Sequence, residues 1–283
     1  MEFEIGAVES KRHSFLIKLG DYMNLLKTLK LMTLGIAMML MPMGLLAQSH
    51  LKQILERGEL RVGTTGDWNP MTLIDPATQK RKGFDIDVAT ALAADMGVKV
   101  NFVPTTWKTL VNGILADKYD MSTSASLSPK RALVAGYSKS YFAVVDVPLM
   151  NRSNAGKFNS WEDLNSPSVT VAVTMGTVQE KRARVLFNKA KIITVSAPAR
   201  DYQEVLAGRA DASMTSNLEA ANLVKKYSQL QKVPVEEGKS PTPLAMLLPQ
   251  SDQVWINYVN LWIELKKERG FFKELEAKWL SGE

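Results

Sequence analysis

Short apolar runs alternate along this chain with stretches in which apolar residues recur every three or four positions. The first spacing is typical of buried strands, and the second is typical of helices with one face in a core. In the first half of the chain the expected strands lie at residues 60–63, 98–103 and 143–150. The expected helices lie at residues 51–58, 83–97 and 105–115. Strands that alternate with helices predict an α/β fold with a mostly parallel sheet.

The same alternation restarts after a polar segment at residues 151–156, which predicts a second lobe. Its expected strands lie at residues 170–173, 192–195 and 212–214. Its expected helices lie at residues 178–187, 202–206 and 218–224. Within the first lobe, after the expected helix at residues 105–115, the Ser-rich residues 122–131 are expected to form a polar loop.

An apolar segment at residues 241–249 predicts that the chain returns to the first lobe. The helix after it carries the apolar residues expected to pack there, namely Val254, Tyr258, Leu261, Trp262 and Leu265. The expected boundaries are a leader at residues 1–47, a first lobe at 48–148 and 242–283, and a second lobe at 149–241. Two crossings between two lobes predict a hinged pair with a ligand cleft between them.

Residues 23–47 have the pattern of a secretory signal peptide. Lys27 and Lys30 precede an apolar run at residues 31–46, which ends at the small residue Ala47. The alternative is a membrane anchor, but the run is shorter than the ~20 residues that a spanning helix needs. We therefore expect cleavage near Ala47 and a periplasmic location. Residues 1–22 lack this pattern, which is consistent with an extension upstream of Met23.

Charge and composition exclude several kinds of function. The 283 residues carry a formal charge of +6, which is too mild and too dispersed to indicate a nucleic-acid partner. The chain has no Cys and two His, of which His13 lies in the expected leader and His50 at the expected new terminus. Catalytic triads, zinc sites and general bases that need an imidazole are therefore not expected. We expect no metal, no cofactor and a monomer.

The end of the expected strand at residues 212–214 is the first candidate for a ligand site. In open α/β sheets, ligands bind outside the carboxyl ends of strands, where helix N-termini also point. Ser216 and Glu219 lie at this point in the sequence. Their spacing also fits a capping box, in which Glu219 would serve only its own helix. Both interpretations of Glu219 remain open from the residues alone.

Arg131 is the second candidate. It follows the Ser-rich stretch, and a planar guanidinium beside hydroxyl groups is suited to hold a carboxylate through two hydrogen bonds. The alternative is a surface Arg at the start of a helix. Ser124 and Ser126 are selected as ligand-facing, with Ser122 and Thr123 as the alternatives within the same stretch.

Two further segments are expected to complete the site. The Gly176-Thr177 turn lies between a strand and a helix, where free N–H groups attract an anion, although Thr177 and Glu180 also fit a capping box. The polar loop at residues 64–70 contains Asp67 and Trp68, and Trp68 is expected to wall the ligand. Trp107 could do the same or pack in the core.

Five motifs resemble, in order and spacing, those of family 3 of the periplasmic solute-binding proteins, the amino-acid-binding family that serves ABC importers. They are Gly63-Thr64-Thr65-Gly66-Asp67-Trp68, Gly83-Phe84-Asp85-Ile86-Asp87, Ser128-Pro129-Lys130-Arg131, Gly176-Thr177-Val178-Gln179-Glu180 and Gly208-Arg209-Ala210-Asp211. The first lobe also resembles the cyclohexadienyl dehydratases, exported enzymes that convert prephenate or arogenate to an aromatic product. The resemblance implies a two-lobed periplasmic-binding-protein type II fold.

The resemblance also implies roles for individual residues. Arg131 matches the arginine that clamps the ligand's α-carboxylate. Ser216 departs from both groups, which have an acid at this position, so a zwitterion is expected to bind weakly unless Glu219 replaces that acid. Glu219 matches the general acid of the dehydratases. Asparagines and a lysine of the dehydratase site are replaced here by Thr174, Gln179 and Leu244.

Together these features predict a periplasmic solute-binding protein that captures a small organic anion or amino-acid-like ligand and delivers it to an ABC permease. The alternative is an exported dehydratase on the same fold, with Glu219 as its catalytic acid. The enzyme interpretation is the less favoured one. The expected ligand site comprises Asp67, Trp68, Trp107, Ser124, Ser126, Arg131, Thr174, Gly176, Thr177, Ser216 and Glu219.

Overall fold

The computed structural model describes residues 48–280, and the expected leader and signal peptide at residues 1–47 lie outside them. The helices are α2 (His50–Arg57), α3 (Phe84–Asp95), α4 (Leu110–Leu115), α5 (Pro129–Ala132), the short 3-10 helix η1 (Arg152–Asn154), α6 (Val178–Leu186), α7 (Asp201–Leu206), α8 (Asn217–Lys226), α9 (Gln253–Glu268) and α10 (Phe271–Trp279). No helix among these described residues is long and apolar enough to span a membrane.

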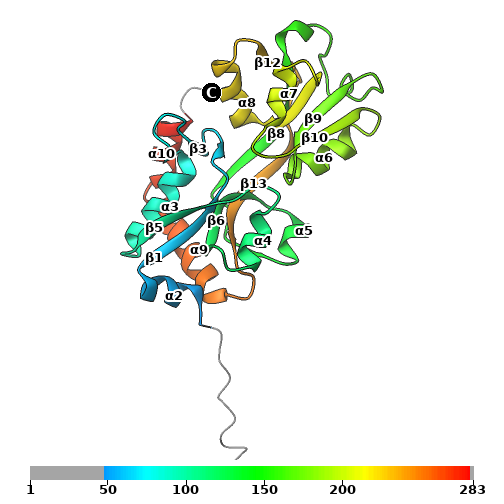
Figure 1. Cartoon of the computed structure of the whole chain (residues 1–283). Helices are drawn as coiled ribbons and strands as arrows, with labels where there is room; N and C mark the ends of the chain where they lie inside the picture. Colours follow the sequence, from blue (N-terminus) through cyan, green and yellow to red (C-terminus); the bar gives the residue numbers. More distant parts are fainter. Residues whose placement is uncertain (1–47, 281–283) are drawn as a thin grey trace, which may run out of the picture. The chain divides into compact units, whose positions relative to one another are not determined.

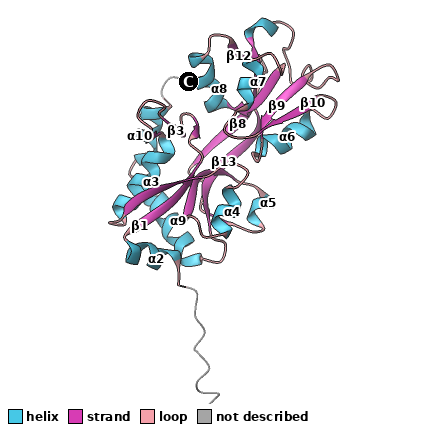
Figure 2. Cartoon of the chain, in the orientation of Figure 1, coloured by secondary structure: helices cyan, strands magenta, loops and turns pink. Residues whose placement is uncertain are grey.

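One sheet continues through both lobes, and helices pack against its faces (Figure 2). In the described part of the chain its order is β10, β9, β11, β8, β13, β6, β1 and β5, with β12 beside β8 and β7 beside β13. These strands are β1 (Glu59–Thr64), β5 (Lys99–Pro104), β6 (Met121–Ser126), β7 (Gly136–Tyr137), β8 (Phe142–Asn151), β9 (Thr170–Thr174), β10 (Lys191–Val195), β11 (Ala212–Ser216), β12 (Leu230–Lys232) and β13 (Lys239–Leu248).

A second, three-stranded sheet lies in the first lobe and carries part of the site. It consists of β2 (Asp67–Trp68), β3 (Thr72–Ile74) and β4 (Arg81–Lys82), all antiparallel. Gly83 precedes α3 with a positive φ of 134°, and a Cβ there would lie 2.4 Å from the carbonyl oxygen of Met71. The glycine therefore lets α3 start directly against this small sheet.

The parallel sheet expected from the sequence is present within each lobe. In the first lobe β1 pairs in parallel with β5 and β6, and in the second lobe β9 pairs in parallel with β10 and β11. Parallel strands align their carboxyl ends, so the segments after β1, β6, β9 and β11 reach the same region of the molecule. This arrangement positions the site residues described below.

Each lobe has its own apolar core. In the first lobe Val62, Phe84 and Trp255 belong to one buried cluster that joins β1, α3 and α9. In the second lobe Val171 and Ala172, which are adjacent on β9, belong to two different clusters. Adjacent strand residues point to opposite faces, so helices cover both faces of the second lobe's sheet.

Two long antiparallel strands join the lobes (Figure 1). β8 leaves the first lobe and pairs with β11 and β12 in the second, whereas β13 returns and pairs with β6 in the first. β8 and β13 also pair with each other, with Phe142 opposite Leu244 and Asp146 opposite Lys239. The two-lobed α/β fold with two crossings is therefore confirmed, while the precise lobe boundaries remain a prediction.

The prediction of residues 122–131 as a loop is wrong except at residues 127–128, because residues 122–126 lie in β6 and residues 129–131 lie in α5. β6 lies in the interior of the sheet between β1 and β13, and Met121 to Ala125 are all buried. Its small hydroxyl-bearing side chains fit under the covering layers, and neighbouring strands on both sides satisfy its backbone. Composition alone misleads here because serine is common in loops but is also small enough for a crowded central strand.

The buried face of α9 differs in part from the expected one, although Trp262 and Tyr258 pack on the first lobe's core as predicted. Trp255, Ile256, Val259, Trp262 and Ile263 are buried. By contrast, Val254, Leu261 and Leu265 are 58%, 56% and 44% exposed. α9 has apolar residues on more than one face, and the large Trp255 and Trp262 side chains determine which face is buried. The helix does pack on the first lobe, as predicted.

Candidate functional site

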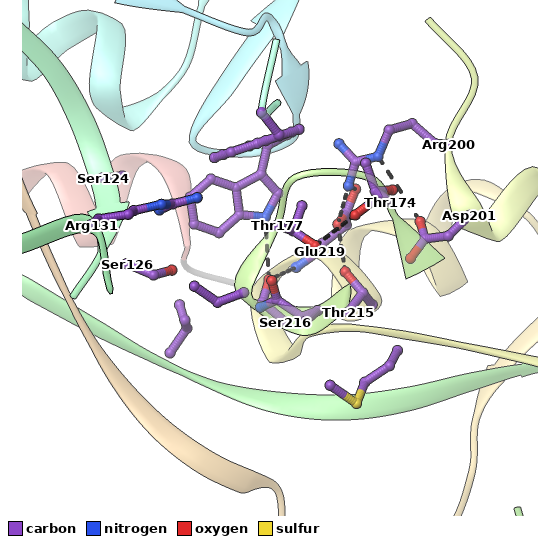
Figure 3. A pocket seen from close by; sticks show the side chains of 16 residues that line it. Ser124, Ser126, Arg131, Thr174, Thr177, Arg200, Asp201, Thr215, Ser216 and Glu219 are labelled. Atoms are coloured by element: carbon purple, nitrogen blue, oxygen red, sulfur yellow. Dashed lines mark hydrogen bonds and ion pairs between the residues drawn. The ribbon is translucent and has the colours of Figure 1, made fainter. Parts of the chain in front are cut away.

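A pocket lies where the two lobes meet, and the roughly 490 Å³ of empty space that it marks out includes open solvent at its mouth. Nine residues selected from the sequence line it: Trp68, Trp107, Ser124, Ser126, Arg131, Thr174, Thr177, Ser216 and Glu219. The other lining residues are Val144, Val178, Gln179, Arg200, Asp201, Met214 and Thr215. Figure 3 shows Arg131, Ser124 and Ser126 on one side of the pocket and Arg200, Asp201 and Glu219 on the other.

Arg131 is a buried cation at the wall of this pocket. It lies on α5, and its side chain is 7% exposed. Its Nη2 donates a hydrogen bond to the carbonyl oxygen of Gly176 at 3.1 Å, which joins the first lobe to the second. A guanidinium carries five N–H donors, so the bond to Gly176 leaves other donors able to bind a carboxylate. The alternative of a surface Arg does not hold.

The Gly176-Thr177 turn meets Arg131, but not in the way expected. The N–H of Gly176 donates to the Glu180 carboxylate at 2.9 Å, and the N–H of Glu180 donates to Thr177 Oγ1 at 3.2 Å. Glu180 therefore caps its own helix, as the capping-box spacing predicts. The amide of Gly176 is not free for a ligand, and only its carbonyl oxygen faces Arg131. The anion-binding role expected of this amide is corrected accordingly.

Two carboxyl groups, those of Asp201 and Glu219, lie on one side of the pocket, which we call the acid side. Arg200, which precedes α7, lies between them. Its Nη2 donates to both carboxylate oxygens of Glu219, at 2.8 and 2.7 Å. Thr215 Oγ1 also donates to Glu219, at 2.5 Å. The Glu219 carboxylate does not fold back on its own N-cap backbone, because Arg200 and Thr215 bind it, while Ser216 Oγ accepts from the Glu219 N–H. The helix-cap interpretation of Glu219 thus holds for its backbone and fails for its carboxylate.

Burial dominates the electrostatics of this acid side. It raises the pKa of Glu219 to about 7, while the charge of Arg200 and the Thr215 hydrogen bond lower that pKa, and the charges of Asp201 and Asp67 raise it. Burial also raises the pKa of Asp201 against the lowering effect of Arg200. The pKa of Arg200 is raised, since its three carboxylate neighbours outweigh the effect of burial. The cluster therefore holds Arg200 charged, while burial makes Glu219 and Asp201 easier to protonate.

The loop after β1 brings Asp67 and Trp68 to the second lobe. Trp68 Nε1 donates to Ser216 Oγ at 3.2 Å, and Trp107 packs edge-on against Trp68 with ring centroids 5.7 Å apart. Trp107 Nε1 donates to Asp67 Oδ1 at 3.1 Å. Trp107 thus lines the pocket and also packs against the first lobe's core. Asp67 lies behind this wall and contacts the pocket through Arg200.

Ser124 lines the pocket but its hydroxyl is directed into the first lobe. Its Oγ donates to Asp85 at 2.5 Å, and its N–H donates to the Tyr141 hydroxyl at 2.6 Å. Burial raises the pKa of Asp85 to about 7 in spite of these hydrogen bonds. Ser124 has a positive φ of 43°, so the chain turns out of the ideal strand at the pocket wall. Ser126, two residues on, also lines the pocket.

Arg200 and Asp201 are site residues that the sequence analysis misses. The available signal is weak: two adjacent charges at the start of a helix, with Gln203 in place to complete a capping box. Such charges are normally solvated, yet Arg200 is 6% and Asp201 is 2% exposed. The partners of Arg200 are 19 and 133 residues away in sequence, so spacing could not reveal the pairing.

One group of potential metal ligands occurs elsewhere in the described residues. His50, Asp117 and Asp120 have ligand atoms within 4.8 Å of one another. Arg61 already pairs with Asp117 at 2.5 Å and with Asp120 at 2.7 Å. His50 is held at the start of α2, since its N–H donates to Asp252 at 2.5 Å. These contacts give the three side chains structural partners, so the cluster has a structural role without a metal.

The fold and the pocket define the class of protein as a two-lobed α/β binding protein of the periplasmic-binding-protein type II kind. The family model of the bacterial extracellular solute-binding proteins, family 3, matches residues 60–282, and the chain belongs to this family.

Relatives of two kinds share this architecture. The chain is 31% identical to cyclohexadienyl dehydratase of Pseudomonas aeruginosa over 82% of this chain and 87% of that protein. It is 27% identical to a probable amino-acid ABC transporter-binding protein of Haemophilus influenzae over 82% and 90% of the two chains. The crystal structure of an ancestral amino acid-binding protein, a precursor of cyclohexadienyl dehydratase, is 38% identical with a TM-score of 0.76 and covers 82% of this chain and 99% of that one.

Proposed function

We propose that this protein is the solute-binding component of an ABC importer and that it closes on a small ligand that carries a carboxylate. The observation that carries the proposal is Arg131, a buried guanidinium at the wall of an interlobe pocket, in a chain of a solute-binding family. A buried charge of this kind needs an opposite charge or several hydrogen bonds to offset its desolvation. A ligand carboxylate supplies both.

The neighbours of Arg131 favour a ligand with an organic body. Trp68, Trp107, Val144, Val178 and Met214 offer apolar walls, and several hydroxyl groups offer hydrogen bonds. Ser216 places no charge where the resemblance implies an acid, so an organic anion is favoured over an ordinary zwitterionic amino acid. The proposed ligand class is therefore a small carboxylate or an amino-acid-like molecule with a reduced positive charge.

The importer role implies a location and a partner. The family consists of extracellular solute-binding proteins, and the expected signal peptide would place this chain in the periplasm. There the closed, loaded protein would act as a monomer and deliver its ligand to an inner-membrane permease. Release of the signal peptide near Ala47 would leave Ser49 and His50 at the start of α2, where both bind Asp252.

A second function, an exported prephenate or arogenate dehydratase, is favoured by Glu219. This acid lines the pocket, and burial raises its pKa to about 7, which suits a group that gives up a proton near neutrality. Decarboxylation with loss of water forms an aromatic ring and requires one positioned acid and an anion clamp. Against it, Arg200 and Thr215 already hold the Glu219 carboxylate as an acceptor.

Two measurements on the purified protein test these functions. A thermal-shift screen of amino acids, keto acids, and di- and tricarboxylates is expected to reveal at least one carboxylate that raises the melting temperature. A ligand at 100 times its Kd adds about 2.7 kcal/mol to the stability of the folded state. Failure of every carboxylate, with tight binding of cationic or neutral solutes, would overturn the proposed ligand class.

Incubation with prephenate or arogenate separates the two functions. The importer proposal predicts no aromatic ultraviolet band above that of a protein-free control. Turnover that Glu219→Gln abolishes, with ligand-induced thermal stabilisation retained, would instead establish the dehydratase. Glutamine keeps the shape of the glutamate side chain but removes both its proton and its charge opposite Arg200, so retained thermal stabilisation by the ligand is the control for an intact site.

A further inference from the structure

We propose that Arg200 is a positioning residue that ties the Glu219 carboxylate of the second lobe to Asp67 of the first lobe and thereby sets the closed form of the pocket. This inference deepens the proposed function, since capture by closure requires contacts that exist only when the lobes meet. It concerns a residue that neither the sequence motifs nor the pocket chemistry of Arg131 accounts for.

The first half of the contact lies entirely within the second lobe. Arg200 precedes α7 and Glu219 lies in the first turn of α8, and both side chains are nearly fully buried. The Arg200 Nη2 atom donates to both Glu219 oxygens, at 2.8 and 2.7 Å. Because both residues belong to one lobe, this pair persists whether the lobes are open or closed. It holds the guanidinium at the edge of the second lobe.

The second half of the contact crosses to the first lobe. Arg200 Nη1 donates to the backbone oxygen of Asp67 at 2.8 Å and lies 3.1 Å from Asp67 Oδ2. Asp67 belongs to β2, and its other carboxylate oxygen accepts from Trp107 Nε1. The two ends of this carboxylate are thus held by one residue from each lobe. Separation of the lobes would break only the Arg200 end.

The residues after Asp67 make the same crossing. Trp68 Nε1 donates to Ser216 Oγ at 3.2 Å, and Asn69 Nδ2 donates to Asn222 Oδ1 at 3.2 Å. Three consecutive residues of the first lobe therefore bind three residues of the second. Trp68 lines the pocket, so docking of this segment places an aromatic wall over the ligand site. Arg200 supplies the one charged contact in this set.

Among these interlobe contacts, the charged contact of Arg200 with Asp67 is expected to contribute most to the stability of the closed form. Asp67 is 22% exposed in its side chain and Arg200 is 8% exposed, so their attraction is only partly screened by water. A hydrogen-bonded ion pair contributes more than a neutral pair of amides or an indole and a hydroxyl. Loss of the Asp67 charge should therefore open the lobes, whereas the Arg200–Glu219 pair should govern the folding of the second lobe.

The chain contains no Cys, which allows the closure equilibrium to be measured directly. Spin labels at Lys118→Cys and Lys189→Cys, two exposed positions in different lobes, report the interlobe distance by double electron–electron resonance. The measurement uses the ligand-free protein. Its result is thus independent of whether the proposed ligand class is correct, and a failed ligand screen would leave it interpretable.

Asp67→Asn is expected to lower the ratio of closed to open distances at least threefold. Asparagine keeps the acceptor for Trp107 and the backbone oxygen, so only the charged contact is lost. Arg200→Gln combined with Glu219→Gln removes the buried pair without leaving a lone charge, and it should open the lobes to a similar extent. Adding Asp67→Asn to that double variant should then have no further effect, because its partner is already gone.

The exposed Arg209–Glu204 pair of the same lobe provides the control, and Arg209→Gln should leave the distances unchanged. The proposal is overturned if Asp67→Asn leaves the distance distribution as in the unmodified protein. It is also overturned if the effects of the Asp67 and Arg200/Glu219 changes simply add, since independent effects would mean that the residues do not act through one contact.

Discussion

Gly176 of the second lobe lies so close to Lys108 of the first that a Cβ atom on Gly176 would stand 2.4 Å from the Lys108 backbone nitrogen. The same Cβ would lie 2.7 Å from the carbonyl carbon of Trp107. Both neighbours are backbone, which cannot move aside as a flexible side chain can. The two lobes are therefore in close backbone contact at Gly176, beside the pocket. Arg131 of the first lobe also donates to the Gly176 carbonyl oxygen there.

Gly176→Ala is expected to hinder closure and weaken ligand binding by at least tenfold. Part of any effect would come from its positive φ of 84°, which an Ala adopts at a cost of about 1 kcal/mol. Gly208→Ala is the matched control, since Gly208 has a φ of 70° and nothing within 4 Å of the added Cβ. Calorimetric titration with the best ligand of the screen, together with small-angle scattering, distinguishes the two. Equal losses for both variants would contradict the steric explanation.

Arg131→Gln is expected to weaken binding of a carboxylate ligand by at least 30-fold. Removing one side of a buried charge pair costs about 2–5 kcal/mol, and 2 kcal/mol corresponds to roughly a 30-fold change in Kd. Lys130→Gln is the control, because Lys130 is the exposed neighbour on the same helix. Isothermal titration of both variants measures the effect. If Lys130→Gln weakens binding as much, the loss reflects overall charge rather than a carboxylate clamp.

The fold could largely be predicted because most of it follows from local patterns. The strands at residues 60–63 and 170–173 correspond to β1 and β9, each an apolar run between turn signals. The Ser-rich strand β6 could not be predicted, since its burial comes from neighbours far along the chain. For α9, apolar residues on several faces left the choice to the packing of Trp255 and Trp262. Tertiary contacts decided both cases.

The candidate site, like the fold, could be predicted where local signals determine it and not where tertiary contacts do. Strand ends and helix starts are local signals, so Arg131, Thr177, Ser216 and Glu219 could be selected, and the structure brings them to one pocket. What each side chain binds could not be predicted, because the partners are distant in sequence. Glu219 pairs with Arg200 rather than with its own helix. The Gly176 amide, which the sequence predicts to face a ligand, donates instead to Glu180.

Asp85 is expected to make the stability of the protein depend on pH. Its pKa is raised by burial to about 7 in the folded state, from a value near 3.8 when exposed. The folded state thus holds a proton that the unfolded state loses, so the Asp85 contribution is complete below pH 4 and is lost as the pH rises to 7. A shift of this size corresponds to a loss on the order of 4 kcal/mol.

Urea unfolding between pH 4 and pH 7 measures this dependence. Asp85→Asn should flatten the decline in the free energy of unfolding, because the amide cannot ionise and its oxygen can still accept from Ser124 Oγ. Glu219→Gln should remove a separate part of the same decline, since burial also raises the pKa of Glu219 to about 7. A decline that stays unchanged in Asp85→Asn would show that this carboxyl group is not the one that titrates.

Ser216→Asp is expected to shift the ligand preference from simple carboxylates to amino acids. Ser216 Oγ accepts from Trp68 Nε1 and from the Glu219 N–H, both at 3.2 Å, and an Asp carboxylate can accept from both. The change thus keeps these hydrogen bonds and adds a negative charge to the pocket wall. That charge would pair with an α-ammonium group, whereas the Glu219 carboxylate of the present site is already hydrogen-bonded to Arg200.

The comparison of L-phenylalanine with 3-phenylpropionate isolates this effect, because the two differ only in the ammonium group. Ser216→Asp should raise the ratio of their affinities in favour of the amino acid by at least tenfold, as expected for a new charge-assisted hydrogen bond worth about 1.4 kcal/mol or more. Ser216→Asn adds the same volume without the charge and should leave the ratio unchanged. An equal shift in both variants would mean that size at position 216, and not charge, selects the ligand. In that case the neutral Ser216 could no longer be taken as the reason to expect an organic anion in this pocket.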